Sequence, residues 1–582
     1  MKKLLLSILL AFLPLLANAE TVEIDGIWYK LFPKAQEAEV TNNPNIDAFT
    51  GSYSGDIVIP SSFIYNDIKY SVTSIGYFAF FSSIGLTSVD IPNSVTSIDT
   101  NAFTYCSSLS FVTIPNSVTS IGSSAFGLCS SLSSVSIPNS VTSIGTGAFL
   151  GCTDLTRIKV EDSNPEYDSR NDCNAIIRTS ANELVAVCKN TVIPPSVTSL
   201  GPSVFAYCTY LTSFSIPNSV TSIGVSAFHG CSNLVSISLH NNVTSIGDRA
   251  FQDCSALTSF TIPNSITRIG EHTFSGCLSL KNIDFPKSVR DIKNYAFEGC
   301  INLTSIHLHK GIEIISGHAF HGCSGLTSIV LEDGNPNFDS RNDCNAIIYK
   351  GSNSLITGCK NTIIPPTVTS ISTEAFYGCS GLTTIDIPNS VTKIDYGVFY
   401  GCSDLKSIII PNSVKQLPND GFRDCISLTS VYIPNSVTFI GEGTFRNCSG
   451  LSMICIPNSV TFIKKYAFEG CSSLKDFYCF ADILPDSYPS IFNDTPCELA
   501  TLHVPARSLD LYKQTKPWSD FGNIVALTDD DPKPTGIKSF KEDSHSNPVG
   551  IYSLDGKQLY KEQHGLNIIR MSDGTTKKVM IK

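Results

Sequence analysis

The chain has 582 residues, of which 42% are hydrophobic and 16% charged, and its formal net charge is −11. This much apolar material is enough for a sizeable core, so the composition argues against a largely disordered chain. The negative charge and the lack of a long basic run argue against nucleic acid or an anionic membrane surface as the partner.

The first nineteen residues have the pattern of an export signal. Lys2 and Lys3 precede an apolar run from Leu4 to Leu16, and Ala17-Asn18-Ala19 supplies the small residues of a cleavage site before Glu20. The run is too short to span a membrane comfortably, and no other transmembrane candidate occurs. We therefore expect an exported protein that is secreted or held at the cell surface, with no transmembrane segment in the mature chain.

A pattern F-x-x-C recurs every 23 residues along most of the chain, and twice the step is 56 residues, which adds an insert of 33. A fixed period of this length predicts a solenoid, because a single coil cannot bury its own apolar side whereas stacked coils can. The cysteines of the pattern are Cys106, Cys129, Cys152, Cys208, Cys231, Cys254, Cys277, Cys300, Cys323, Cys379, Cys402, Cys425, Cys448 and Cys471.

One unit, residues 109–131, shows the expected layout of a coil. Leu109, Val112 and Ile114 predict a first short strand, which Pro115-Asn116-Ser117 ends as a turn. The β-branched run 118–121 predicts a second strand. The A-F-x-x-C residues that follow predict a single helical or 3₁₀ turn. The fold class is therefore an α/β solenoid of short parallel strands with short helical or 3₁₀ turns.

With its L-x-x-I-x-I-P and A-F-x-x-C motifs, the repeat resembles the BspA-like leucine-rich repeat family of bacterial surface proteins. The resemblance implies an N-terminal cap at 20–71, a solenoid at 72–473, and hairpin inserts at about 161–193 and 332–364 that we expect to protrude. It also implies a C-terminal cap at 474–527. Residues 528–547 are charged and contain proline, which predicts a linker. Residues 548–582 predict a small β unit that resembles the C-terminal sorting tails of type IX secretion; a β addition of other use is the alternative.

The cysteines divide into two groups. Those of the repeat point the same way in one column, so we expect free thiols that act as small apolar residues. In each insert two cysteines flank a predicted hairpin, and either a cross-strand disulfide or two free thiols fits this spacing; the pairs are Cys173 with Cys188 and Cys344 with Cys359.

No motif predicts catalysis, a cofactor or a metal site. His307, His309, His318 and His321 lie close in sequence, but no carboxylate or cysteine completes a metal-binding spacing, so we expect solvated side chains. Serines recur in every unit, whereas an active site is singular, and no G-x-S-x-G or H-E-x-x-H motif occurs. We expect a protein that is not an enzyme.

Large side chains interrupt the outward columns of the last units, where earlier units carry mostly serine or threonine. Exposed apolar clusters commonly mark contact sites, although the C-terminal cap could also cover part of this one. The candidate ligand-binding residues are Ile409, Tyr432, Phe439, Met453, Phe462 and Tyr478, with Cys455 beside them.

The family resemblance implies an adhesin-like function, in which the protein binds host extracellular proteins or other bacterial cells. Two alternatives remain open at this point. One is a glycan-binding component of a nutrient-acquisition surface, which requires aromatic platforms beside polar side chains. The other is a structural spacer, which the uniform serine and threonine columns of the early units favour.

Overall fold

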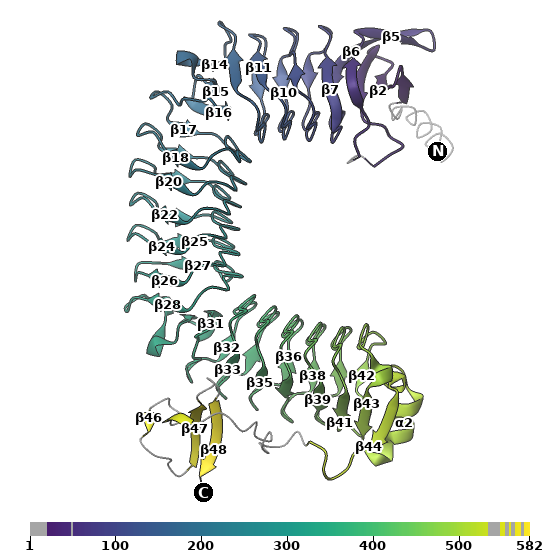
Figure 1. The fold of residues 1–582 in the computed structure, drawn as a ribbon, viewed down its shortest axis with the longest axis vertical. Helices are drawn as coiled ribbons and strands as arrows, with labels where there is room; N and C mark the ends of the chain where they lie inside the picture. The colour runs from purple at the N-terminus through teal and green to yellow at the C-terminus, as the bar shows by residue number, and fades with distance from the viewer. Residues whose placement is uncertain are drawn as a thin grey trace, which may run out of the picture. The chain divides into compact units, whose positions relative to one another are not determined.

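The computed structural model describes residues 20–47, 50–532, 548–552, 558–559, 565–571 and 576–581. The predicted signal peptide and residues 533–547 of the predicted linker lie outside them. The chain divides into two compact units, Met1–Val289 and Arg290–Lys582. In each unit short strands stack coil upon coil (Figure 1), so the predicted parallel-strand solenoid is confirmed.

The first unit begins with a β-rich cap. Strands β1 (Thr21–Ile24), β2 (Ile27–Phe32) and β3 (Glu37–Thr41) are antiparallel, while β5 (Ser62–Tyr65) pairs with β6 (Ile68–Ile75). Asp25 and Gly26 both have positive φ, which is the geometry of a tight hairpin turn. Strand β6 then runs parallel to β3 on one side and to the first coil on the other, so the cap continues directly into the solenoid.

Each coil of the first unit contributes one strand to each of two sheets, and paired residues are 23 positions apart, as Ser120 is from Ser97 and Ser143. The first-sheet strands are β4 (Ser54–Val58), β7 (Gly85–Asp90), β9 (Phe111–Val112), β11 (Ser134–Ile137), β13 (Arg157–Val160), β18 (Ser213–Ser215), β20 (Ser236–Ser238), β22 (Ser259–Thr261) and β24 (Asn282–Asp284). The second-sheet strands are β8 (Ser97–Ile98), β10 (Ser120–Ile121), β12 (Ser143–Ile144), β17 (Ser199–Leu200), β19 (Ser222–Ile223), β21 (Ser245–Ile246) and β23 (Arg268–Ile269).

The third side of each coil is a series of turns, so the predicted helical or 3₁₀ turn at A-F-x-x-C is wrong. Ser124 and Leu128 have φ values of 53° and 60°, which interrupt any run of helical backbone. The amides of Ser124, Phe126 and Leu128 instead donate to carbonyls of the next coil, at 3.0, 2.8 and 2.7 Å. The amides between them, those of Ala125, Gly127 and Cys129, donate within the coil to the residue three positions earlier, so bonds between coils alternate with turn bonds.

The sequence predicts that the first insert protrudes, whereas in the structure one of its strands is part of the second sheet. It contains β14 (Tyr167–Asp168), η1 (Arg170–Asp172), β15 (Ala175–Arg178) and β16 (Glu183–Val187), and β15 and β16 form an antiparallel hairpin. Strand β16 pairs in parallel with β17, which places buried Leu184 in register with Leu200. The insert therefore supplies a layer of the second sheet, because its apolar strand is buried by the next coil.

The second unit has the same architecture. Its first-sheet strands are β26 (Ser305–Leu308), β28 (Ser328–Leu331), β33 (Thr384–Asp386), β35 (Ser407–Ile409), β37 (Ser430–Tyr432), β39 (Met453–Ile456), β41 (Asp476–Cys479), β43 (Thr501–Val504) and β44 (Asn523–Ala526). Its second-sheet strands are β25 (Asp291–Ile292), β27 (Ile314–Ile315), β32 (Ser370–Ile371), β34 (Lys393–Ile394), β36 (Gln416–Leu417), β38 (Phe439–Ile440), β40 (Phe462–Ile463) and β42 (Asp486–Ser487). The second insert contains β29 (Phe338–Asp339), η2 (Arg341–Asp343), β30 (Ile347–Tyr349) and β31 (Ser354–Thr357), and β31 pairs with β32.

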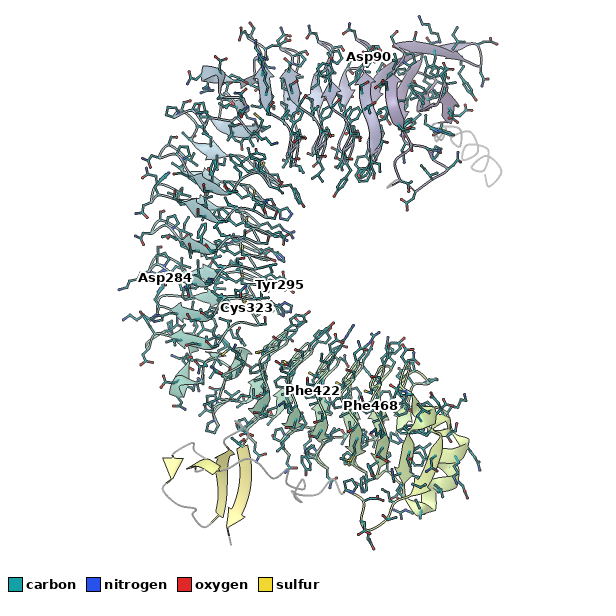
Figure 2. All side chains as sticks on the ribbon, in the orientation of Figure 1. Asp90, Asp284, Tyr295, Cys323, Phe422 and Phe468 are labelled. Carbon is teal, nitrogen blue, oxygen red and sulfur yellow. The ribbon has the colours of Figure 1, made fainter. Side chains whose placement is uncertain are left out.

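A column of phenylalanines forms the centre of the core. In the second unit Phe376, Phe399, Phe422, Phe445 and Phe468 stack with successive ring centroids 5.3, 5.5, 5.4 and 5.6 Å apart. Figure 2 labels Phe422 and Phe468 in this column. All five rings are buried, and burial of one such side chain stabilises the fold by about 1.5–3 kcal/mol.

The last coil is covered by a compact cap of short helices, namely η3 (Cys497–Leu499), η4 (Ala506–Ser508), α2 (Leu509–Gln514) and η5 (Trp518–Asp520). Trp518 is 1% exposed and packs edge-on against Phe477, Phe492 and Tyr512. Farther along, β45 (Pro548–Tyr552), β46 (Gln558–Leu559), β47 (Gly565–Met571) and β48 (Thr576–Ile581) form an antiparallel sheet. The sorting role of this tail stays a prediction.

Candidate binding surfaces on the last coils

Four of the predicted site residues lie on first-sheet strands of the second unit, namely Ile409, Tyr432, Met453 and Tyr478. Ile409 pairs in register with Tyr432 on β37, and β39, which carries Met453 and Cys455, lies beside β37. Ile409 is 47% exposed, and the other three side chains are half-buried. We call Ile409, Tyr432, Met453 and Cys455 the first-sheet patch.

Tyr478, which the sequence analysis places among the exposed candidates, is only 8% exposed. Its ring stacks on His503 with the centroids 4.1 Å apart, and the Asp531 carboxylate lies 4.0 Å from Nδ1 of His503. The thiol of Cys455 contacts the Pro532 carbonyl at 3.8 Å. The segment after the cap therefore folds back over this end of the column, and Tyr478 does not belong to an exposed surface.

Phe439 and Phe462 lie on the second sheet, so the structure does not bring them together with the first-sheet patch. They are in register on β38 and β40, and their rings stack with centroids 5.7 Å apart and planes 4° from parallel. Nζ of Lys464 lies 5.6 Å from the centroid of the Phe439 ring. The sequence predicted one site, whereas the structure has two surfaces on different sheets.

A hollow of about 460 Å³ opens beside Phe439. We call it the second-sheet groove. It crosses strands β34, β36 and β38, and its lining is mixed in character, with three lysines, two aromatic rings and several polar side chains. The residues that line it are Thr392, Lys393, Ile394, Asp395, Tyr396, Lys415, Gln416, Leu417, Pro418, Asn419, Phe439 and Lys464.

One column of the coil carries mostly larger residues than glycine at this groove. The residue that follows the second strand is Gly122, Gly145 or Gly247 in earlier coils, where a Cβ atom would come within 2.5 Å of backbone atoms of the preceding coil. At the groove the same column carries Asp395, Pro418 and Lys464, with only Gly441 among them. The sequence did not predict this surface, and the loss of glycine does not single it out, because the same column carries Asp99, Lys293, Ser316 and Ser372 in other coils.

The insert cysteines are free thiols in the structure, so the predicted disulfides are not formed there. The hairpin register pairs Ala175 with Val187, so the two cysteines at its base do not face each other. Instead the Cys188 thiol lies 3.3 Å from the Asn174 carbonyl, and the Cys359 thiol lies 3.4 Å from that of Asn345.

The repeat cysteines are buried free thiols, as the sequence predicts. Most of these thiols donate to the carbonyl of the phenylalanine in the preceding coil; Cys129 to Phe103 and Cys425 to Phe399, both at 3.1 Å, are examples. Burial raises the pKa of Cys106 and of Cys152 to about 12. Protonated thiols in this environment are structural donors and not nucleophiles.

His307 is exposed, as predicted, whereas the other three histidines of this group are less solvated than predicted. His309 is 7% exposed, and Nε2 of His318 and Nε2 of His321 each lie 3.2 Å from Oε2 of Glu374. The His321 ring also stacks on Tyr377 with the centroids 3.7 Å apart. Burial lowers the pKa of His321, although the carboxylates of Glu374 and Glu298 oppose this shift. The cluster joins the coils on either side of the second insert, so the sequence spacing does not reveal it.

In the described part of the chain, no group of three or more His, Cys, Asp or Glu side chains has an arrangement suited to a metal ion. Within the same residues, no helix has both the length and the apolar character needed to cross a bilayer.

Solved structures of bacterial repeat proteins resemble the chain. A leucine rich cell surface protein from Faecalibacterium prausnitzii is 24% identical, covering 79% of this chain and 94% of its own, with a TM-score of 0.43. A leucine-rich repeat protein from Bacteroides ovatus is 25% identical, covering 87% and 100%, with a TM-score of 0.31. The pneumococcal vaccine antigen PcpA is 14% identical, covering 88% and 99%, with a TM-score of 0.35. A search among curated proteins finds no match.

A family model gives the decisive comparison. The BspA type leucine rich repeat region matches in six copies, over residues 57–171, 177–300, 245–342 and 348–475. These ranges include most of both inserts and most of the coils described above. The chain therefore belongs to the BspA-type leucine-rich repeat family.

Proposed function

We propose that this protein is an exported, adhesin-like binding protein that contacts host extracellular proteins or other bacterial cells through the first-sheet patch. Membership of the BspA-type family supports a surface protein of this kind. Repeat solenoids commonly use their extended surfaces for binding. Export and surface display are part of the proposal and stay predictions.

The observation that carries the proposal is the change of character in one outward column. In the first unit this column holds Thr113 on the coil of β9, Ser136 on β11 and Ser215 on β18, all of them exposed. In the second unit it holds His307, Val330 and Asp386 and then Ile409 and Tyr432, which lie side by side on β35 and β37. Neither side chain is needed for the core, so a bulky apolar pair here is best explained by contact with a partner.

The energy available from this pair is sufficient to dominate an interface. Removal of one such side chain from water contributes about 1.5–3 kcal/mol, and a few anchors of this kind usually supply most of the binding energy. Serine and threonine columns offer much less apolar area per residue. The surface of the last coils should therefore bind more tightly than that of the early coils.

Substitution of both anchors tests the proposal. The double variant Ile409→Ser and Tyr432→Ser restores the character of the early coils, so it should fold as the native protein does. We expect its binding to immobilised extracellular matrix proteins, measured by surface plasmon resonance, to weaken by at least about tenfold. Phe111→Ser, which removes a 56% exposed ring from the first-sheet strand β9 of the first unit, is the control and should bind normally. Unchanged binding by the folded double variant would contradict the proposal.

A further inference from the structure

The second-sheet groove has features that the proposed protein contact does not use. We propose that it binds an anionic polysaccharide, a polymer of sugars that carry carboxylate or sulfate groups. The groove lies on a different sheet from the first-sheet patch and shares no residue with it. The two sites can therefore be tested independently.

Positive charge is concentrated in the groove, although the whole chain has a net charge of −11. Lys393, Lys415 and Lys464 line it, against the single carboxylate of Asp395. Lys393 pairs with Asp395 at 2.7 Å but its side chain stays 70% exposed. Over the described residues, neither of the other two lysines makes an ion pair. Two ammonium groups are thus available to an anionic ligand.

Lys415 departs from a column that has a structural reason to be threonine. Thr96, Thr119 and Thr142 each donate a side-chain hydrogen bond to the carbonyl of the preceding coil, at 3.2, 3.2 and 3.4 Å. On the neighbouring coils of the groove, Thr392 and Thr438 make the same bond at 3.4 Å. A lysine side chain has no hydroxyl group to donate this hydrogen bond, so Lys415 lacks a stabilising contact that the threonines of this column make. Its exposed ammonium group is the property gained in return.

Aromatic rings beside the lysines provide platforms for sugar rings. Tyr396 is 43% exposed. Phe439 is half-buried, with one face stacked on Phe462, and stands where most coils of the first unit carry serine. The apolar C–H face of a pyranose packs on such rings. The side-chain amides of Gln416 and Asn419 lie in the same lining. Oδ1 of Asn419 accepts from the Glu442 amide at 2.8 Å, which fixes the side chain at the edge of the groove.

The geometry favours a polysaccharide over other polyanions. The groove crosses successive coils about 4.8 Å apart, so a repeating polymer meets the same backbone at each step. An extended acidic peptide commonly adds to a free strand edge, whereas β38 is already paired with β36 and β40. Nucleic acid binding depends on broad positive surfaces, and the net charge of this chain is negative.

The experiment uses the full chain without residues 1–19 and four soluble polymers in affinity electrophoresis. These are polygalacturonate, dextran sulfate, neutral dextran and single-stranded DNA. We expect retardation by one or both of the acidic polysaccharides, weakened by added salt because charges are screened, and none by dextran. The polymer that retards the protein more strongly identifies the carboxylate or the sulfate as the preferred acid.

Column-restoring variants link this retardation to the groove. Lys415→Thr and Phe439→Ser should each weaken binding by about tenfold or more, while Lys415→Arg should retain it, because the charge is kept. Arg268→Ser, which removes an exposed charge from the same sheet in the first unit, is the control and should bind normally. The Ile409→Ser and Tyr432→Ser double variant should also bind the polysaccharide normally.

Three results would overturn the proposal. Equal retardation by dextran would show that the acidic groups are not recognised. Stronger retardation by DNA than by either acidic polysaccharide would assign the groove to a different polymer. Normal binding by both folded variants, Lys415→Thr and Phe439→Ser, would place any polysaccharide site elsewhere on the chain.

Discussion

At the scale of single residues, the repeat cysteine combines two properties that no other small side chain offers together. It is apolar enough to be fully buried beside the phenylalanine column, and its S–H group still donates to a carbonyl of the preceding coil, as in Cys254 to Phe228 at 3.2 Å. A serine would bury a more strongly hydrated group, and an alanine would leave the carbonyl with one partner fewer. The column is thus a chain of contacts between coils.

Thiol counting tests this description of the cysteines. The native protein should react slowly with alkylating reagents at pH 8, because burial raises the thiol pKa values, that of Cys106 to about 12, and little thiolate forms. After unfolding in denaturant without reductant, all 21 cysteines should react, as measured by mass spectrometry. Recovery of four fewer thiols, with Cys173, Cys188, Cys344 and Cys359 protected, would show that the insert disulfides do form.

At the scale of elements, the two inserts pack into the solenoid in the same way. They differ in the side chains at their junctions, where the coil before the insert meets the coil after it. Each hairpin supplies a strand that continues the second sheet, with Leu184 in β16 and Leu355 in β31 fully buried. On the turn side the first junction brings Leu150 near Gly147 and Ser203. At the equivalent positions of the second junction are His321, His318 and Glu374. At these three positions, only the second junction therefore has groups that titrate near neutral pH.

The second junction should make stability depend on pH. Burial lowers the pKa of His321 below its ordinary value of about 6.5, so the unfolded chain takes up the proton first as the pH falls. The contribution to stability is complete above about pH 6.5 and is lost as the pH falls toward the lower pKa of the folded state. We expect the melting temperature to fall between pH 7.5 and 5.5, and to fall less in His321→Leu, which copies Leu150.

A second variant separates this cause from a general effect of acid. Glu374→Gln removes a carboxylate that favours the charged imidazole, with His318 and Glu298 still beside the ring. The pKa of His321 should then fall further, so the loss of melting temperature on acidification should be larger than in the native protein. An identical pH response in both variants and the native protein would rule out the junction as its source.

At the scale of the whole molecule, each coil contacts mainly the coils before and after it. Stability is therefore close to a sum of coil and neighbour contributions, and the ends need caps that replace the missing neighbour. At the C-terminal end this role belongs to Trp518, Phe477 and Phe492, which continue the aromatic core beyond Phe468. Damage at a cap should spread only as far as neighbouring coils depend on it.

The variant Trp518→Ala tests this locality. Removal of a ring that is 1% exposed should destabilise the C-terminal coils by about 3–5 kcal/mol. Hydrogen exchange followed by mass spectrometry should show faster exchange in peptides of β39–β44, and unchanged exchange in peptides of the first unit. Uniformly faster exchange along the whole chain would mean that the solenoid unfolds as a single cooperative body.

The sequence by itself determined the period, the two strands of each coil and the inward direction of the Leu, Val, Ile, Phe and Cys columns. Those features follow from local alternation and from the need of identical layers for identical contacts. Tertiary structure alone decided that the inserts become layers, that residues 528–532 cover Tyr478, and that His321 meets Glu374. It also divided the predicted site between two sheets, because side chains seven residues apart, as Tyr432 and Phe439 are, can lie on different sides of a coil. These contacts join segments whose separation in the sequence has no fixed relation to their distance in space.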